Sequence, residues 1–434
     1  MTDLAAVDYF SDEAVTQDPY PYYEYLREQG PVVAEPHHGV VAVTGYDEAV
    51  AAFKDQDSFS AVNAIGGPFP PLPFEPGGDD ITEQIEAHRH EFPIFEHIVV
   101  LDPPAHERAR ALMSKLLTPL RLKENAEYIE QLADHQLDEF IANGRCEFLF
   151  EYAKPFATLA IADLLGVPED DRAEFRRRLG AGAPPGARVG ALDGEPVGLN
   201  PLEYLDEKFI GYLTDRRREP RTDVLGDLAA ATYPDGTVPE IIEVVRPATF
   251  LFGAGQETVT KLFGTIVQVL GEQPDLQQRL RDDRDLVPRF IEECLRIQSP
   301  TKVDFRLARK TTTLGGVRIK AGTVVMLCLG AANRDPRKFE NPDQFHLDRA
   351  NVREHIAFGR GIHTCPGTPL VRVEARITVN RMLDRMRDIT IGEAEHGPAG
   401  ARRYAYEPTF LLRGLKELHI EFTPLGEQPQ NRTE

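Results

Sequence analysis

The chain has 434 residues, with 49 Lys and Arg against 70 Asp and Glu, so its formal net charge is −21. Hydrophobic residues make up 41% and charged residues 27%, which excludes a disordered or fibrous chain. The acidic excess argues against a nucleic-acid binder, because a duplex would repel it. Four scattered cysteines are too few for a disulfide scaffold and favour a reducing compartment.

The N-terminal segment, MTDLAAVDYFSDEAV, is acidic and has no apolar run, so it predicts neither a signal peptide nor a membrane anchor. No later window reaches the roughly 18 uninterrupted apolar residues of a membrane-spanning helix. We therefore expect a soluble, cytoplasmic protein, and a monomer.

The first hundred residues predict one short helix and several strands. Residues 18–30 predict a turn and a helix that ends at Gly30. Residues 32–43 are rich in Val and have hairpin character. The Pro- and Gly-rich stretch 58–104 predicts a long irregular loop, which is either functional and mobile or a disordered insertion.

Helical patterns dominate from residue 104 onward. We expect helices at 105–117, 119–142, 147–165, 168–179, 201–218, 238–270, 284–298 and 369–388, with a second long loop at 180–200. Residues 303–330 alternate and contain a Gly315-Gly316 turn, which predicts short strands. The fold class is therefore mainly α with small β-sheets. We expect a single domain, with a β-rich part at about 30–60, 303–330 and 390–424 and a helical part at about 104–300 and 366–388.

The most informative segment is FGRGIHTCPG, which contains Cys365 and precedes an amphipathic helix. Unpaired N–H groups and the dipole at a helix N-terminus favour a thiolate. Glycines around the cysteine let a flat partner lie against the backbone. The pattern suits a sulfur that stays ionised and binds a metal. A buried structural cysteine is one alternative, and a zinc site with His363 is another, although no two further ligands lie nearby in the sequence.

This segment resembles the haem-ligand signature of the cytochrome P-450 superfamily, in its soluble bacterial branch. The signature Phe-x-x-Gly-x-x-x-Cys-x-Gly is matched by Phe358, Gly361, Cys365 and Gly367, and the resemblance extends over nearly the whole chain. It implies haem b (iron protoporphyrin IX), with Cys365 as the thiolate ligand of the iron and with Phe358 and Gly359 beside the cofactor. Thiolate donation favours O–O cleavage. The haem would lie between a long distal helix (238–270) and a proximal cysteine loop and helix (358–388).

Glu293 and Arg296 lie three residues apart on a helix and could form an ion pair. Alone, such a pair is an ordinary surface feature worth roughly a few tenths of a kcal/mol. The resemblance implies instead a buried structural clamp, completed by Arg349, that serves folding and haem retention.

His106 and Arg110 share one helical face, which alone would be a solvated charged face. The resemblance implies that both reach a haem propionate, together with Arg306 and His363. Cationic partners fit, because unpaired propionates would be costly to bury.

The stretch from Ala254 to Thr258 puts small residues and an adjacent acid and hydroxyl into an apolar helix, where both are normally unfavourable. A packing notch with a solvent-facing Glu257 is one interpretation. The resemblance implies that Ala254 and Gly255 make room for oxygen, that Thr258 hydrogen-bonds it, and that Glu257 relays protons. Val259 stands where relatives often carry a second Thr. Pro247 either kinks this helix or marks its true start.

The resemblance also implies a substrate pocket and a redox partner. The pocket would be lined by loops 60–100 and 180–200 and by Phe250, Ala254, Val303, Phe305, Phe410 and Leu411, and would take a lipophilic terpenoid or steroid-like molecule. Lys302 and Asp304 either orient an oxygenated group or pair with each other. An acidic ferredoxin would dock on a proximal basic patch of Arg108, Lys115, Arg372 and Arg376, unless these are scattered surface charges.

The leading functional hypothesis is a haem-thiolate monooxygenase. It would insert one atom of O2 into a C–H bond, with electrons from NAD(P)H through a reductase and a ferredoxin. A peroxide-driven peroxygenase needs no acid–alcohol relay, so Glu257 and Thr258 argue against it. A non-catalytic haem-binding gas sensor and a structural zinc or thiol protein are the remaining alternatives.

Overall fold

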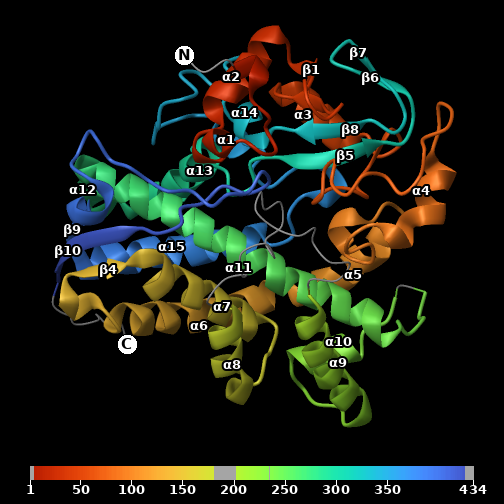
Figure 1. Cartoon of the computed structure of the whole chain (residues 1–434). Helices are drawn as coiled ribbons and strands as arrows, with labels where there is room; N and C mark the ends of the chain where they lie inside the picture. The colour runs from red at the N-terminus through yellow and green to blue at the C-terminus, as the bar shows by residue number, and fades with distance from the viewer. Residues whose placement is uncertain (1–3, 180–201, 234, 426–434) are drawn as a thin grey trace.

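The computed structural model describes residues 4–179, 202–233 and 235–425. A long central helix, α11 (Ile241–Glu272), crosses the molecule between a layer of helices and a layer of strands (Figure 1). It is apolar around most of its circumference, as expected of a buried helix. A capping box between Glu240 and Glu243 starts it. Pro247 lies inside this helix, so it does not mark the helix start.

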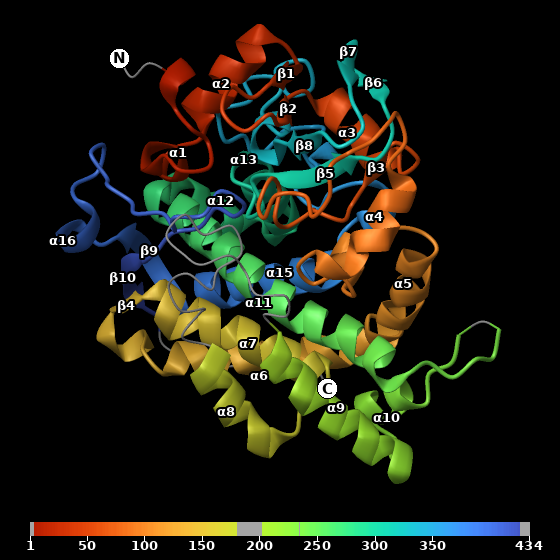
Figure 2. The same ribbon diagram turned by 45° about the vertical axis from the view of Figure 1, so that its right-hand side comes forward.

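The helical layer confirms the helices expected between residues 104 and 388. The α6 and α7 helices lie along one side of α11 in both views (Figures 1 and 2). A π-helical turn at Leu149–Ala153 leads into α7. The principal helices are α5 (Ala105–Leu116), α6 (Pro119–Asp138), α7 (Lys154–Leu164), α8 (Glu169–Leu179), α9 (Glu203–Arg218), α13 (Val287–Ile297) and α15 (Thr368–Arg385).

The principal sheet joins two distant parts of the chain in the order β1-β2-β8-β5-β3. Its strands are β1 (Val32–Ala34), β2 (Val41–Val43), β3 (Phe59–Ser60), β5 (Asp304–Ala308) and β8 (Val324–Leu327). Only the β2–β8 pair is parallel. The predicted Gly315-Gly316 turn is confirmed, because it joins β6 (Thr312–Leu314) to β7 (Val317–Ile319) with both glycines at positive φ.

A second sheet has the order β4-β10-β9, from β4 (Arg145–Glu147), β9 (Met386–Ile391) and β10 (His419–Pro424). The prediction that 390–424 is strand-rich is therefore only partly right, because α16 (Glu393–His396) and irregular chain fill the middle of that range. The helix predicted at 147–165 also begins late, since Arg145–Glu147 pairs with β10.

The prediction of one helix in the first hundred residues is wrong. Besides the expected α2 (Tyr20–Gln29), this part contains α1 (Glu13–Gln17), α3 (Tyr46–Lys54) and α4 (Thr82–His88). The predicted irregular stretch 58–104 includes α4 and packs around buried apolar residues, which contradicts a disordered insertion. Three other short helices were not expected: α10 (Val224–Ala229), α12 (Pro274–Asp282) and α14 (Leu329–Ala332).

Two large hydrophobic clusters flank the centre of the molecule. The larger surrounds α11, α7, α6 and α15, and the other joins N-terminal aromatic residues to β5, β8 and the turn at 410–412. Across the described residues, no helix combines the length and apolarity that a membrane crossing demands. The loop predicted at 180–200 lies outside the described residues.

Candidate functional site

Cys365 lies three residues before α15, in a loop that two glycines shape. Gly359 and Gly361 have φ of +66° and +73°, and a Cβ on Gly361 would lie 2.4 Å from the carbonyl oxygen of Phe53. The Cys365 N–H donates to the Phe358 carbonyl at 2.9 Å, which closes the loop. This geometry holds the sulfur at the N-terminus of α15.

Burial raises the pKa of the Cys365 thiol, although N–H groups of Gly367 and Thr368 and the charge of Arg110 oppose this shift. The backbone N–H groups favour the thiolate, as the sequence predicts, whereas desolvation opposes it, so the role of Cys365 as an ionised metal ligand stays a prediction. A bound metal deprotonates a coordinating thiol outright. In the described part of the chain, no three His, Cys, Asp or Glu side chains gather as metal ligands, so the zinc alternative finds no site.

Four groups predicted to meet propionates gather from three elements: His106 and Arg110 on α5, Arg306 on β5, and His363 in the cysteine loop. The rings of His106 and His363 lie 4.4 Å apart between centroids. Burial, Arg306, His106 and Arg110 together lower the pKa of His363 to about 2. Burial is the largest cause of this shift, and the positive charges beside it add to the effect, as in a site that would receive anions.

His106 carries the clearest sign of a missing partner. Its side chain is buried, and neither ring nitrogen has a hydrogen-bond partner among the described residues. Burial and Arg110 lower its pKa to about 4. Because buried polar atoms are nearly always paired, an acceptor or donor group belongs beside this ring. Haem propionates fit these residues.

Asp304 is a carboxylate at this cluster. It accepts a hydrogen bond from Arg306 at 2.8 Å, so the alternative that it pairs with Lys302 is wrong. Lys302 is buried on the same segment, and its Nζ has no hydrogen-bond partner within the described ranges.

The stretch from Ala254 to Thr258 lies in the middle of α11. Phe250, Ala254 and Thr258 recur every four residues and share one face of the helix. Ala254 is exposed and Thr258 partly exposed, although the neighbouring Phe252 and Val259 are buried. A Cβ on Gly255 would meet nothing closer than Ile161 at 3.9 Å, so close packing does not require this glycine. The structure thus argues against a packing notch.

The acid and the hydroxyl of this stretch have different partners. Thr258 donates to the carbonyl of Ala254 at 2.9 Å, which leaves its oxygen able to accept a hydrogen bond. Glu257 faces Lys261, whose Nζ lies 3.1 Å from Oε1. Lys261 did not feature in the sequence analysis, although its position one turn after Glu257 is a signal for such a pair.

Glu293, Arg296 and Arg349 lie together, with fully buried side chains on the first two. Arg296 donates to both carboxylate oxygens of Glu293, at 2.7 and 2.8 Å, and Arg349 adds contacts at 3.1 and 3.2 Å. The remaining guanidinium N–H groups of Arg296 reach the carbonyls of Asn333, Pro342 and Gln344. The cluster ties α13 to the segment 333–349.

The predicted pocket residues divide into two groups. Phe250 and Ala254 lie on the open face of α11. Phe305 and Phe410 are buried against each other and against Phe10, with centroid distances of 5.3–6.1 Å. Val303 and Leu411 belong to the same buried cluster. Because side chains alternate along β5, Phe305 points away from the face that carries Arg306. The place of these four residues in a substrate pocket stays a prediction.

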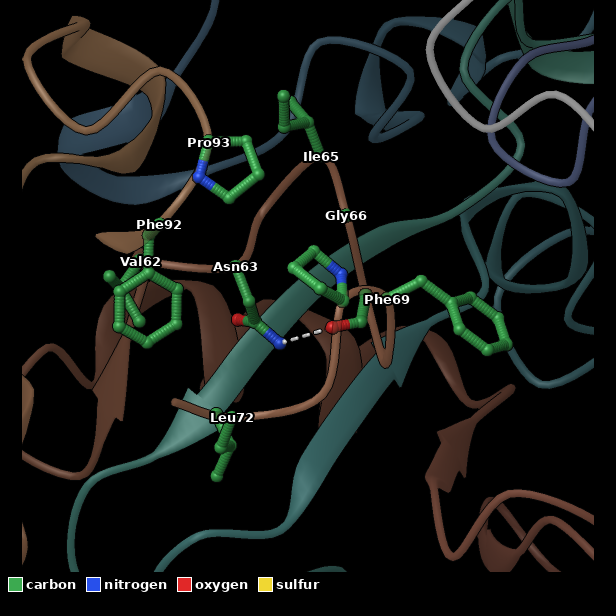
Figure 3. Close-up of a pocket in the computed structure, with 10 residues that line it drawn as sticks. Val62, Asn63, Ile65, Gly66, Phe69, Leu72, Phe92 and Pro93 are labelled. Carbon is green, nitrogen blue, oxygen red and sulfur yellow. Dashed lines mark hydrogen bonds between the residues drawn. The ribbon is translucent and has the colours of Figure 1, made fainter. Parts of the chain in front are cut away.

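A small pocket lies within the segment 58–104. Figure 3 shows Val62, Phe92 and Leu72 around the amide of Asn63, while the ring of Phe69 points away from them. Asn63 donates to the carbonyl of Gly67 at 3.2 Å, which braces the loop.

The predicted basic patch is partly neutralised. Arg372 donates to Glu292 at 2.6 Å, and Arg108 lies 3.6 Å from Glu243 and over the ring of Tyr233. Lys115 and Arg376 are exposed.

Glu292 connects Arg372 to His355, which lies 3.0 Å from its other oxygen. Burial raises the pKa of Glu292, but hydrogen bonds from His355 and Arg372 outweigh it and lower this pKa to about 2. Because this pKa is lower in the folded protein than in the unfolded chain, the ionised carboxylate stabilises the fold at pH values above 4.5, the pKa of the unfolded chain. This stabilisation is lost as the pH falls from 4.5 toward 2.

We therefore expect the wild type to lose about 2 kcal/mol more unfolding free energy than Glu292→Gln between pH 5 and pH 3. Urea denaturation at both pH values measures this difference. Glu395, an exposed acid, provides the control, and Glu395→Gln should follow the wild type. Equal losses in the wild type and in Glu292→Gln would contradict the assignment.

A mainly helical fold with a glycine-flanked cysteine, a cluster of Arg and His side chains near it and a partly exposed face on its central helix is typical of the class of haem-thiolate proteins. Comparison with known proteins supports the same class. The family model described as Cytochrome P450 matches residues 229–392. The chain belongs to the cytochrome P450 family; it is a monooxygenase, and haem b is the family's cofactor.

Relatives and solved structures cover nearly all of the chain. The biotin biosynthesis cytochrome P450 of Bacillus subtilis is 30% identical over 94% of this chain and 96% of its own. Cytochrome P450 144 of Mycobacterium tuberculosis is 32% identical over 95% and 90%. The substrate-free structure of Mycobacterium marinum CYP150A6 shares 60% identity and a TM-score of 0.92, covering 98% of this chain and all of that one.

Proposed function

We propose that Cys365 ligates the haem iron and that His106, Arg110, Arg306 and His363 receive the propionates. The observation that carries this proposal is the buried His106 ring, whose two nitrogens have no partner in the described segments, beside three further groups that repel one another. Thiolate-ligated haem activates dioxygen and favours cleavage of its O–O bond. In this proposal Phe358 and Gly359 lie beside the haem on the side of the cysteine. Ala254 and Gly255 leave room for oxygen on the other side of the haem, along α11.

The residues of α11 manage protons in this proposal. Glu257 takes up a proton and passes it toward Thr258, whose hydroxyl donates it at the open face of the helix. Thr258 already donates to its own helix, so it must turn to act, as hydroxyl groups readily do. This acid–alcohol pair supports a monooxygenase that uses O2 over a peroxide-driven enzyme or a gas sensor.

The substrate in this proposal is a lipophilic small molecule, of the terpenoid or steroid class. Phe250 and Ala254 offer an apolar surface. One relative at 26–27% identity, CYP109E1 of Bacillus megaterium, has structures in complex with corticosterone and with testosterone. Another at 29%, P450BioI, was solved with an acyl carrier protein that carries hexadec-9Z-enoic acid.

Electrons would come from NAD(P)H through a reductase and an acidic ferredoxin, which would dock near Lys115 and Arg376. These cations are exposed and unneutralised by any ion pair in the described part of the structure, which supports charge attraction there. The four free cysteines support a reducing, cytoplasmic setting.

Thr258→Ala tests the monooxygenase assignment. We expect the variant to keep consuming NADPH while its yield of product per NADPH falls about tenfold or more, because general acid–base groups contribute about 10²–10⁴. The assay uses enzyme reconstituted with a ferredoxin system and a substrate selected from terpenoids, steroids and fatty acids by the low- to high-spin shift. Thr260→Ala, two residues along the same helix, is the matched control and should stay coupled. Unchanged coupling in Thr258→Ala would sink the assigned role.

A further inference from the structure

Lys261 is a buried lysine that two carboxylates share. Its side chain is 3% exposed, and its Nζ contacts Glu257 at 3.1 Å and also hydrogen-bonds Glu407. Glu257 and Lys261 lie one turn apart on α11, whereas Glu407 comes from the segment between α16 and β10. The proposed proton carrier is therefore joined through a buried cation to a distant second acid.

The backbone is shaped to admit this arrangement. A Cβ on Gly414 would lie 2.3 Å from Cγ of Lys261, so only glycine at this position leaves room for the lysine stem. The Glu407 N–H donates to the carbonyl of Gly414 at 3.0 Å, and the adjacent Tyr406 and Leu415 form a β-bridge. The same turn thus presents the carboxylate and opens the passage for the lysine.

The charges around Lys261 explain why its ammonium group contacts two carboxylates. Burial lowers the pKa of Lys261, but Glu257 and Glu407 outweigh it, so the pKa is raised. Burial also lowers the pKa of Lys302, and repulsion from Arg413 and Lys261 adds to this shift. In such a cationic setting one carboxylate alone would leave Lys261 poorly compensated.

We propose that Lys261 and Glu407 are positioning residues for Glu257: Lys261 holds this carboxylate in place on α11, and Glu407, by competing for the same ammonium group, leaves it free enough to exchange a proton. The inference rests on the proposed relay role of Glu257. It adds two residues to the relay, one of them about 150 positions away in the sequence.

The two partners should fail in different ways. Lys261→Met releases Glu257 from its anchor, so its carboxyl group is no longer held in one position on α11. Glu407→Gln removes the competing charge, so Lys261 binds Glu257 more firmly and proton exchange slows. Lys261→Arg keeps the cation and should restore most of the function, which a role in packing alone would not predict.

The experiment compares these variants in the reconstituted holoenzyme. The measurements are product formed per NADPH, the solvent deuterium isotope effect on turnover, and the dissociation constant from the substrate spin shift. We expect Lys261→Met to lower coupling about fivefold, as partial loss of an acid–base relay would. We expect Glu407→Gln to raise the isotope effect, and substrate affinity to stay within about twofold in each case.

Lys208 on α9 provides the matched control, since it also joins two carboxylates, Asp171 at 3.3 Å and Glu174 at 3.0 Å, both of them on α8. Lys208→Met should leave coupling unchanged. The double variant Lys261→Met with Glu407→Gln leaves no unpaired buried carboxylate and should uncouple like Lys261→Met, so a folding defect of the single variant does not prevent the test.

The outcomes distinguish the relay role of Glu257 from the positioning role of Lys261 and Glu407. If Glu257→Gln uncouples the enzyme while both Lys261 variants stay coupled, the positioning role is overturned and the relay stands. If Glu257→Gln itself stays coupled, the relay is overturned together with the positioning role. If Lys261→Arg is as uncoupled as Lys261→Met, the requirement for a cation at this position is contradicted.

Discussion

Cys365→Ser should abolish the red-shifted Soret band that the reduced, carbon monoxide-treated enzyme gives when a thiolate ligates the iron. A serine hydroxyl ionises far less readily than a thiol, and its oxygen is a less polarisable ligand than sulfur. The variant therefore cannot give the iron a thiolate ligand. The loss should be complete, because no other cysteine lies in the loop that ends at α15. Absorption spectra and the haem content of the purified variant are the measurements.

A second cysteine provides the control for this spectrum. Cys146 is buried in β4, where burial raises the pKa of its thiol well above the ordinary value, as in a packing residue. Cys146→Ala should keep the thiolate band, with some loss of stability from the removed sulfur. An unchanged band in Cys365→Ser, or its loss in Cys146→Ala, would refute the assignment of the ligand.

Glu293→Gln should lose about 3–5 kcal/mol of unfolding free energy, because Arg296 and Arg349 would keep buried charges without a carboxylate. A loss of this size is a large share of the 5–15 kcal/mol typical of a folded domain. We expect little haem-containing protein at 37 °C. Urea denaturation and the yield of holoprotein at 20 °C measure the effect.

Glu124 supplies a control with the same spacing on a surface helix. Arg121 and Glu124 form an i,i+3 pair at 3.0 Å, with Glu124 half exposed. Glu124→Gln should change stability by less than about 0.5 kcal/mol, because surface ion pairs contribute little. Comparable losses in Glu124→Gln and Glu293→Gln would show that burial of the clamp does not matter.

The sequence was most informative where one periodic pattern decides the structure. The helix α11 could be predicted nearly to its ends, since its apolar residues extend over many turns. The short α3 and α12 were missed, although local signals exist: Asp47 and Glu48 in the first turn of α3, and Pro274 at the first position of α12. Neither helix is long enough for its periodicity to outweigh the neighbouring turn residues.

For the site, the sequence predicts only the contacts within one helix. His106 and Arg110 could be placed on one face, because both lie on α5. Their approach to His363 and Arg306 depends on contacts between elements about two hundred residues apart or more, which only the family resemblance anticipated. No local pattern links Lys261 to Glu407, and none shows that Phe305 turns toward Phe10, because both follow from tertiary packing.

The parallel pairing of β2 with β8 constrains how this protein is made. Val43 pairs with Leu327, about 280 residues later in the chain. At 5–20 residues per second, the ribosome needs about 15–60 s between these two strands. During that time the edge of β2 that later pairs with β8 is unpaired, and an isolated hairpin is only marginally stable. Completion of the principal sheet must therefore wait until most of the polypeptide has been synthesised, and the nascent chain depends on its helices for early structure.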